Sequence, residues 1–234
     1  MTNNQLISIP EPDLVERKKI LKQTLWVWFF TMLAIRGFHE LQRISALRDY
    51  TLVLTAAALI YVPIWIFYRR KERVGFFEPD LKSLGKSLLW FLAVSIVVFP
   101  ILEIGNRFYQ EIIFHRSYVG GNLKGLASFA FFQLVIVAIP EEIFYRGYMQ
   151  VQLNRVWGRP WKLLGAHVGK GFWFTAVIFA FSHSLIQLQW WHFSIFFPGL
   201  VFGWLREKTD SVTASALFHA LSNSYSFWVI HNYR

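Results

Sequence analysis

A few ionisable residues stand inside or directly beside long apolar stretches of this 234-residue chain, where they could do chemistry. One uncharged stretch ends directly at Glu141 and Glu142, and Arg146 follows them. His183 and His219 lie within two later uncharged stretches. An ionisable group at membrane depth costs about 2.5–3.5 kcal/mol on insertion scales, so each one needs a physical reason. Because mutual proximity would satisfy all of them at once, we expect these three segments to meet at one polar site.

Helical spacing assigns different surroundings to the two glutamates. Glu142 and Arg146 are four residues apart and share a helix face, so we expect them to form a structural ion pair. Glu141 points about 100° away from Glu142 and is left free to face a cavity. His219 and Asn223 are also four residues apart, so they could donate two hydrogen bonds toward a single point.

These residue types support hydrolysis of a peptide bond by an activated water molecule. A carboxylate takes a proton from the water, a histidine holds or relays that proton, and two donors stabilise the tetrahedral oxyanion. A cysteine nucleophile is excluded because the chain has no cysteine, and the G-x-S-x-G signature of a serine nucleophile is missing.

Two alternative interpretations remain open from the residues alone. Glu141, His183 and His219 are a familiar zinc-binding set, although the H-E-x-x-H signature of many zinc proteases is missing. Intramembrane Glu, His and Arg also fit a proton relay, as in a non-enzymatic transport or immunity-type membrane protein.

The elements that must position these residues are membrane helices. The chain is 55% apolar and only 16% charged, against about 25% charged residues in ordinary soluble domains. A helix needs about 20 residues to cross the hydrocarbon. We therefore expect an all-α membrane protein of about seven or eight spans. The stretch 171–205 should form two short spans joined near Gln187 to His192, or one span and a re-entrant segment. The uncharged stretches are 23–35, 50–68, 87–102, 125–140, 171–205 and 211–233.

The positive charges predict the orientation of the chain. When the 24 Lys and Arg residues are assigned to alternate sides of seven spans, seventeen fall on the side of the N-terminus and seven on the other. The positive-inside rule then predicts a cytoplasmic N-terminus. We expect residues 1–22 to be a cytoplasmic segment and 23–234 a single membrane domain. The basic residues lie between apolar stretches, which favours lipid headgroups over nucleic acid as their partner.

Three motifs resemble those of the CPBP family (also called Abi), the CAAX prenyl protease type II and bacteriocin-processing intramembrane glutamic endopeptidases. The motifs are E-E-I-F-Y-R at 141–146, F-A-F-S-H at 179–183 and H-A-L-S-N at 219–223. The stretch F-F-P-G-L-V-F-G-W-L at 196–205 resembles the glycine-bearing helix that precedes the last motif. The resemblance covers residues 124–234, which we take as the catalytic core.

The resemblance implies roughly eight helices around a conical cavity that faces the cytosol. The orientation predicted from the charges agrees, because the span 125–145 then runs inward and places Glu141 near its cytoplasmic end. The resemblance also implies cleavage near the C-terminus of substrates that are often isoprenylated, without metal or other cofactor. The roles it implies are Glu141 as general base, His183 as its partner, His219 and Asn223 as oxyanion hole, and Glu142, Arg146 and Phe179 as supporting residues.

The substrate class is left open by the sequence. A prenylated CAAX protein, a bacteriocin or pheromone precursor, and a protein with a C-terminal sorting tail or membrane anchor all suit an apolar cavity. The short chain favours a prokaryotic plasma membrane over the endoplasmic reticulum.

Overall fold

The computed structural model describes residues 12–73, 75–121 and 123–234, and most of them are helical. Three short wide-turn (π-helical) segments join the helices: 108–113 extends α3, 133–138 links α4 to α5, and 143–150 links α5 to α6. The helices are α1 (Leu14–Leu41), α2 (Arg48–Arg70), α3 (Leu81–Arg107), α4 (Leu126–Phe132), α5 (Ile139–Glu142), α6 (Val151–Trp157), α7 (Lys170–Gln187), α8 (Phe196–Thr209) and α9 (Thr213–Asn232).

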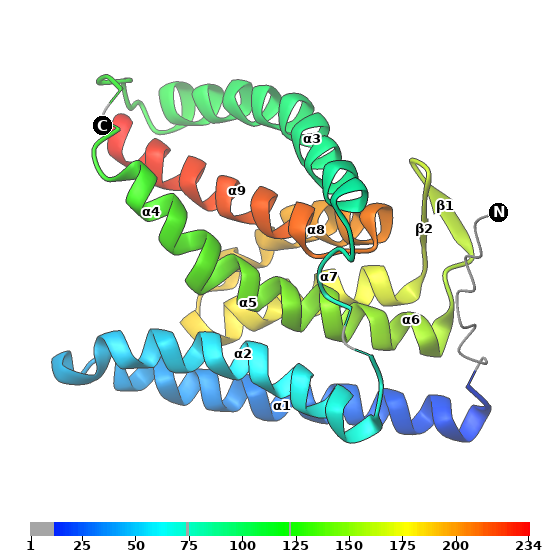
Figure 1. The fold of residues 1–234 in the computed structure, drawn as a ribbon. Coiled ribbons are helices and arrows are strands. Elements are labelled where there is room, and N and C mark those ends of the chain that lie inside the picture. The colour runs from blue at the N-terminus through cyan, green and yellow to red at the C-terminus, as the bar shows by residue number, and fades with distance from the viewer. Residues whose placement is uncertain (1–11, 74, 122) are drawn as a thin grey trace.

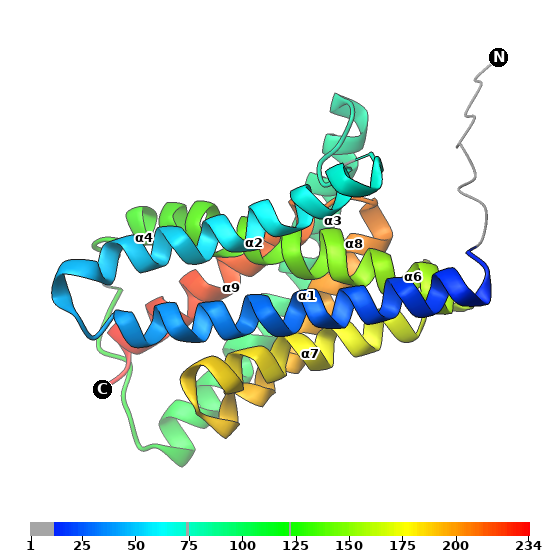
Figure 2. The same ribbon diagram turned by 90° about the horizontal axis from the view of Figure 1, so that it is seen from below.

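Successive helical rods run in alternating directions along one common axis (Figures 1 and 2). One end of the bundle holds the start of α1, the end of α2 and the start of α7, and we name it the proximal end. The other end, the distal end, holds the end of α1, the start of α4 and the end of α9. The rod formed by α4, α5 and α6 passes through the middle of the bundle and contacts α1, α2, α7, α8 and α9.

Three of the helical rods within the described residues are long and apolar enough to cross a membrane: Tyr50–Arg70, Leu81–Ile113 and Leu126–Trp157. The all-α, membrane-type architecture is confirmed, and the count of seven or eight spans stays a prediction. As expected, the long uncharged stretch is divided: α7 ends at Gln187, a 3-10 turn covers 190–195, and α8 begins at Phe196.

The first helix begins earlier than the sequence predicts. Asp13 caps α1 by accepting a hydrogen bond from the backbone N–H of Glu16 at 2.8 Å, so the helix starts at Leu14 inside the charged segment. Residues 14–22 of the expected cytoplasmic segment are therefore part of α1, and the boundary at 22/23 between segment and membrane domain stays a prediction. Residues 1–11 of the expected cytoplasmic segment lie outside the described residues.

A small hairpin is the exception to the all-helical expectation. Strands β1 (Trp161–Leu163) and β2 (Ala166–Val168) pair antiparallel at the proximal end. Leu164 and Gly165 form the two-residue turn with φ of +46° and +79°. Positive φ at both positions is what a type I′ hairpin turn requires, and this turn chemistry was missed.

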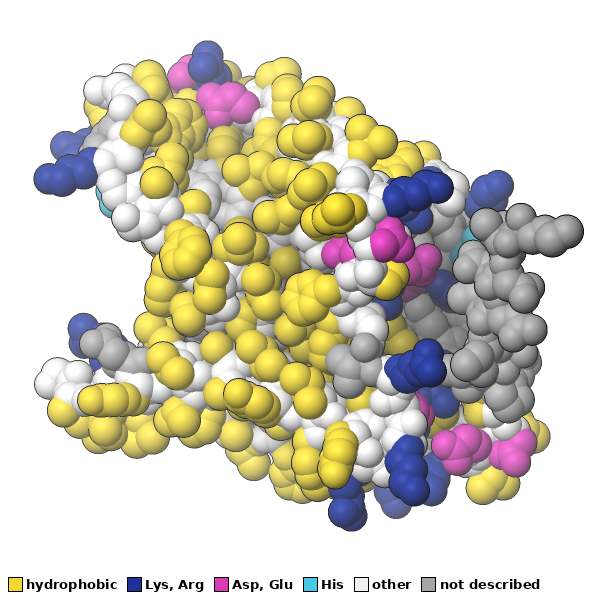
Figure 3. Space-filling model, viewed as in Figure 1, with side chains coloured by type: hydrophobic (Ala, Val, Ile, Leu, Met, Phe, Trp, Pro, Cys, Tyr) yellow, Lys and Arg dark blue, Asp and Glu magenta, His cyan; other side chains and the backbone are white. Residues whose placement is uncertain are grey.

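Large apolar side chains cover the outer surface of the bundle (Figure 3). Phe30 is 59% exposed, Ile96 72% and Phe131 70%. Contiguous apolar surface on this scale marks a surface in contact with lipid or protein rather than with water. The packed core instead surrounds the middle rod, where Phe144, Met149 and Leu153 are fully buried.

Candidate active site

Glu141 and Glu142 lie on α5, between the two wide-turn segments 133–138 and 143–150. Such segments are frequent at functional sites. Pro140 has no N–H to donate to the preceding turn, and the wide turn before it accommodates that loss. Both glutamates fall near the middle of the continuous rod Leu126–Trp157. The rod is longer than one membrane crossing requires, so the position of Glu141 within the span stays a prediction.

The structure pairs Glu142 with Arg146, as their four-residue spacing predicts. Arg146 Nη1 donates to Glu142 Oε1 at 2.8 Å, and both side chains are fully buried. Arg146 Nη2 donates to the carbonyl oxygen of Gly199 at 3.1 Å. The guanidinium carbon also lies 4.1 Å from the ring centre of Phe179 and 5.1 Å from that of Phe202. These contacts hold α5, α7 and α8 around one buried charge pair.

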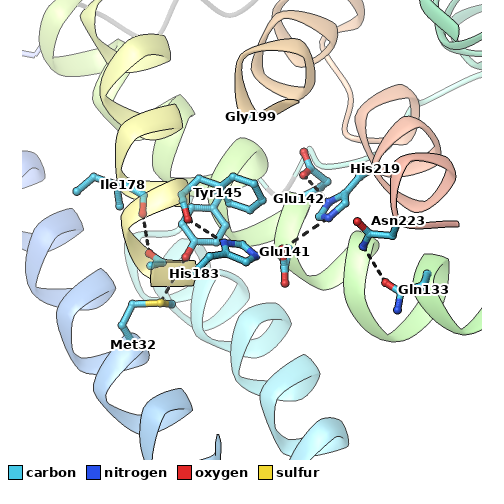
Figure 4. Close-up of polar contacts among 12 residues, drawn as sticks. Met32, Gln133, Glu141, Glu142, Tyr145, Ile178, His183, Gly199, His219 and Asn223 are labelled. Atoms are coloured by element: carbon cyan, nitrogen blue, oxygen red, sulfur yellow. Dashed lines mark hydrogen bonds and ion pairs between the residues drawn. The ribbon is translucent and has the colours of Figure 1, made fainter. Parts of the chain in front are cut away.

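Glu141 points away from this pair and into a cavity (Figure 4). Its Oε2 lies 3.7 Å from Nε2 of His183 and 3.9 Å from Nε2 of His219. Both separations exceed hydrogen-bond distance, so Glu141 Oε2 is buried without a partner among the described residues. A polar contact longer than 3.5 Å leaves room for a bridging water molecule.

The two histidines are oriented by their other ring nitrogen. His183 Nδ1 donates to the carbonyl oxygen of Phe179 at 2.9 Å. His219 Nδ1 donates to Glu142 Oε1 at 3.1 Å, and its ring stacks on Phe202 at a centroid distance of 4.6 Å. With Nδ1 occupied in this way, each ring presents Nε2 toward Glu141.

Asn223 lies one turn after His219 on α9, and both line the cavity. The Asn223 side-chain amide donates to Gln133 Oε1 at 2.8 Å. An amide nitrogen carries two N–H groups, so this bond fixes the orientation of Asn223 and leaves one N–H for a further acceptor.

The cavity has a volume of about 470 Å³. Its floor is formed by Glu141, Tyr145, Phe179, Phe202 and His219. Its walls include apolar side chains of α1 and α2: Met32, Ile35, Leu52 and Leu59. Polar residues at the distal end form its rim: His39, Gln42, Gln187 and Ser226. The space-filling view is hollowed on this same side (Figure 3).

The rim lies at the end of the bundle opposite the start of α1. A cytoplasmic N-terminus and a cytosol-facing cavity therefore exclude each other in this fold. Arg146, which the sequence assigned to the cytoplasmic side, is buried at the site and contributes nothing to the charge of either end.

Three residues of the site were not identified as site residues from the sequence. Gln133 is an isolated amide in an uncharged stretch, and that isolation was the available signal. Gly199 contributes its carbonyl oxygen to Arg146, and a Cβ there would make a tight contact of 3.3 Å with the Phe179 ring. Phe202 gave no signal among the many phenylalanines of the chain.

The sequence also offers Glu141, His183 and His219 as ligands of a metal ion. Within the described ranges, no three His, Asp or Glu side chains are arranged closely enough to be recognised as ligands of one metal ion. The Nε2 atoms of His183 and His219 nevertheless lie 3.7 Å and 3.9 Å from Glu141 Oε2.

Comparison with known proteins gives one match. Residues 123–225 match the model of a family described as type II CAAX prenyl endopeptidase Rce1-like. No curated protein and no solved structure matches the chain. The matched stretch contains all of the predicted site residues: Glu141, Glu142, Arg146, Phe179, His183, His219 and Asn223.

Proposed function

This chain belongs to the CPBP family of CAAX-type membrane proteases, and on that premise we propose that it hydrolyses a peptide bond with a water molecule activated by Glu141. The observation that carries the proposal is the buried and unpartnered Glu141 Oε2 on the floor of the cavity, facing two imidazole nitrogens. A carboxylate that makes no structural bond is free to hold and deprotonate water.

The distances allow a water molecule at the position that the reaction needs. A water oxygen about 2.8 Å from both Glu141 Oε2 and His183 Nε2 spans their 3.7 Å separation. Glu141 takes a proton while the water oxygen attacks the carbonyl carbon of the substrate. The proton then passes to the leaving amine as the C–N bond breaks.

His219 and Asn223 have the proposed task of stabilising the oxyanion. His219 Nε2 and the second N–H of Asn223 both come from the cavity-facing side of α9. His219 donates through Nε2 while Nδ1 donates to Glu142 only in its imidazolium form. Donors held by other bonds need no reorganisation as negative charge develops on the substrate oxygen.

Glu142, Arg146 and Phe179 have a proposed positioning role. Glu142 orients His219, Arg146 neutralises Glu142, and the Phe179 carbonyl orients His183. Hydrogen bonds from surrounding residues hold a reactive side chain in the geometry that the reaction needs.

We propose seven membrane spans, with the catalytic core at 124–234 and the helices before it forming one wall of the cavity. The membrane is a prokaryotic plasma membrane in this proposal. Apolar side chains of α1 and α2 in that wall suit an apolar substrate segment, such as a prenylated or membrane-anchored C-terminus.

The decisive experiment compares Glu141→Gln with Glu142→Gln in cells, by searching the membrane proteome for C-terminal ends that depend on the wild-type protein. Glu141→Gln should abolish these ends, because a general base contributes about 10²–10⁴-fold to rate. It should leave the protein level unchanged, since Glu141 makes no hydrogen bond through Oε2. Glu142→Gln should lower the protein level, because it leaves Arg146 buried without its counter-ion.

The matched control is Glu111→Gln, the same change at an exposed residue outside the cavity. If Glu141→Gln preserves every processed C-terminus, the protease proposal is wrong and a transport or immunity-type role takes its place. A strong chelator separates the zinc alternative: processing by purified protein should continue in its presence, and loss of processing that zinc restores would make Glu141, His183 and His219 metal ligands.

A further inference from the structure

The cavity is closed toward the proximal end. Below its floor the middle rod is fully packed, and Tyr148, Met149 and Leu153 are at most 1% exposed. Gln150 is also buried and donates to the carbonyl oxygen of Gly203 at 3.0 Å. A substrate therefore has to come from the rim at the distal end or through the walls beside it.

The rim is far from the proximal end along every helix that forms it. Gln42 follows the last residue of α1, Gln187 is the last residue of α7, and Ser226 is in the second half of α9. These three helices all begin at the proximal end. The site is therefore a pocket that opens on one side of the membrane only.

The positive charges gather at the end away from the rim (Figure 3). Sixteen Lys and Arg residues lie in or next to the turns at the proximal end, and seven lie toward the distal end. The proximal set is Arg17, Lys18, Lys19, Lys22, Arg69, Arg70, Lys71, Arg73, Lys82, Lys86, Arg155, Arg159, Lys162, Lys170, Arg206 and Lys208. The distal set is Arg36, Arg43, Arg48, Arg107, Arg116, Lys124 and Arg234.

The positive-inside rule assigns the more basic end to the cytoplasm, and every connection between helices here is short enough for the rule to apply. The fold and the charge distribution therefore combine to give the cavity a direction that neither gives alone.

We propose that the cavity opens on the outer, non-cytoplasmic side of the membrane and that the substrate is an exported peptide or the outward-facing end of a membrane-anchored protein. The inference rests on the proposed proteolytic function for its substrate, but its statement about direction does not. A substrate whose C-terminus stays in the cytoplasm, as that of a prenylated protein does, cannot reach Glu141 in this arrangement. Of the two substrates named under the proposed function, the direction of the cavity therefore favours the membrane-anchored one.

The depth of the site adds a requirement on the substrate. His219 lies seven residues before the rim residue Ser226 on α9, which is about 10 Å at 1.5 Å per residue. An extended chain covers that distance with about three residues at 3.3 Å each. The substrate must therefore present about three extended residues to the cavity, as a peptide terminus or an unwound membrane segment does.

The natural absence of cysteine makes the direction directly measurable. Single cysteines are introduced by Ser45→Cys and Ser226→Cys on the rim side and by His167→Cys in the hairpin at the proximal end. All three positions are exposed. Intact cells are treated with a membrane-impermeant maleimide polymer, and a second sample is permeabilised first.

We expect Ser45→Cys and Ser226→Cys to react in intact cells and His167→Cys to react only after permeabilisation. In intact cells the labelled fraction of the two rim-side variants should be at least tenfold that of His167→Cys. Reaction of His167→Cys in intact cells, or equal labelling at the two ends, overturns the proposal. Each variant is also made in the Glu141→Gln background, where the same pattern is expected because labelling needs no proteolysis. The direction of the cavity and the proteolytic function can thus fail separately.

Discussion

The buried pair of Glu142 and Arg146 makes the sharpest prediction about stability. Arg146→Met removes the guanidinium while keeping an apolar chain of similar length. Glu142→Gln removes the carboxylate charge but keeps an oxygen that can accept from His219 Nδ1. The two single variants and the double variant form a cycle that isolates the interaction between the two charges.

The structure sets the size of the expected effects. Arg146→Met leaves a fully buried carboxylate with His219 as its remaining partner, and it removes the hydrogen bond to the Gly199 carbonyl. Breaking a buried ion pair by removing one partner costs about 3–5 kcal/mol. Glu142→Gln leaves the guanidinium of Arg146 buried against two aromatic rings without a counter-ion, and it should lower the free energy of unfolding by a similar amount. The double variant buries no unpaired charge, so its loss should fall at least about 2 kcal/mol below the sum of the single losses.

The assay is reversible unfolding in mixed detergent micelles, monitored through the fluorescence of the eleven tryptophans. The free energy of unfolding is measured for all four proteins under one set of conditions. If the single losses add to within about 0.5 kcal/mol of the double loss, the two charges do not stabilise one another and the structural role given to Glu142 and Arg146 is refuted.

Two further predictions concern single hydrogen bonds. Gln133→Leu removes the acceptor that orients Asn223, so kcat should fall about tenfold with little change in KM. Gln133→Glu keeps an acceptor oxygen and should recover part of that loss. An unchanged kcat for Gln133→Leu would contradict the positioning role. Burial tends to raise the pKa of Glu78, but hydroxyl donors, including Thr213 at 2.6 Å, outweigh it and hold that pKa below its usual value of 4.5. The resulting stabilisation is complete above about pH 4.5 and is lost as the pH falls through the lower, folded-state pKa. Thr213→Val should therefore lower the unfolding midpoint at pH 7 and have a smaller effect near pH 3. The control is Thr209→Val, because the Thr209 hydroxyl donates only to backbone carbonyl oxygens. The effect of this control on the unfolding midpoint should not vary with pH.

Local features of the site could be predicted because helix geometry alone determines them. The four-residue spacing of Glu142 and Arg146 places their side chains on one face of any helix that contains them, and the structure has them 2.8 Å apart. The same geometry turns Glu141 away from the pair and toward the cavity. The division of the stretch 171–205 near Gln187 followed in the same way from the length of helix that a membrane requires.

Other local features were missed although they too are local. The start of α1 at Leu14 depends on the cap at Asp13. The helix boundaries were predicted from apolar content, which does not detect a polar capping residue. The hairpin 161–168 depends on two left-handed residues at Leu164 and Gly165. Leucine at the first of these positions is an unusual choice, so its turn signal was weak.

The class of the protein, its motif residues and the uneven distribution of its positive charges follow from composition, short spacings and the order of the helices. The packing of the helices was needed to show that the Gly199 carbonyl accepts from Arg146, that Gln133 orients Asn223, and that the cavity opens at the distal end. Those contacts join residues 53 to 90 positions apart. No helical period relates such residues, because their distance is set by how the faces of separate helices pack against one another.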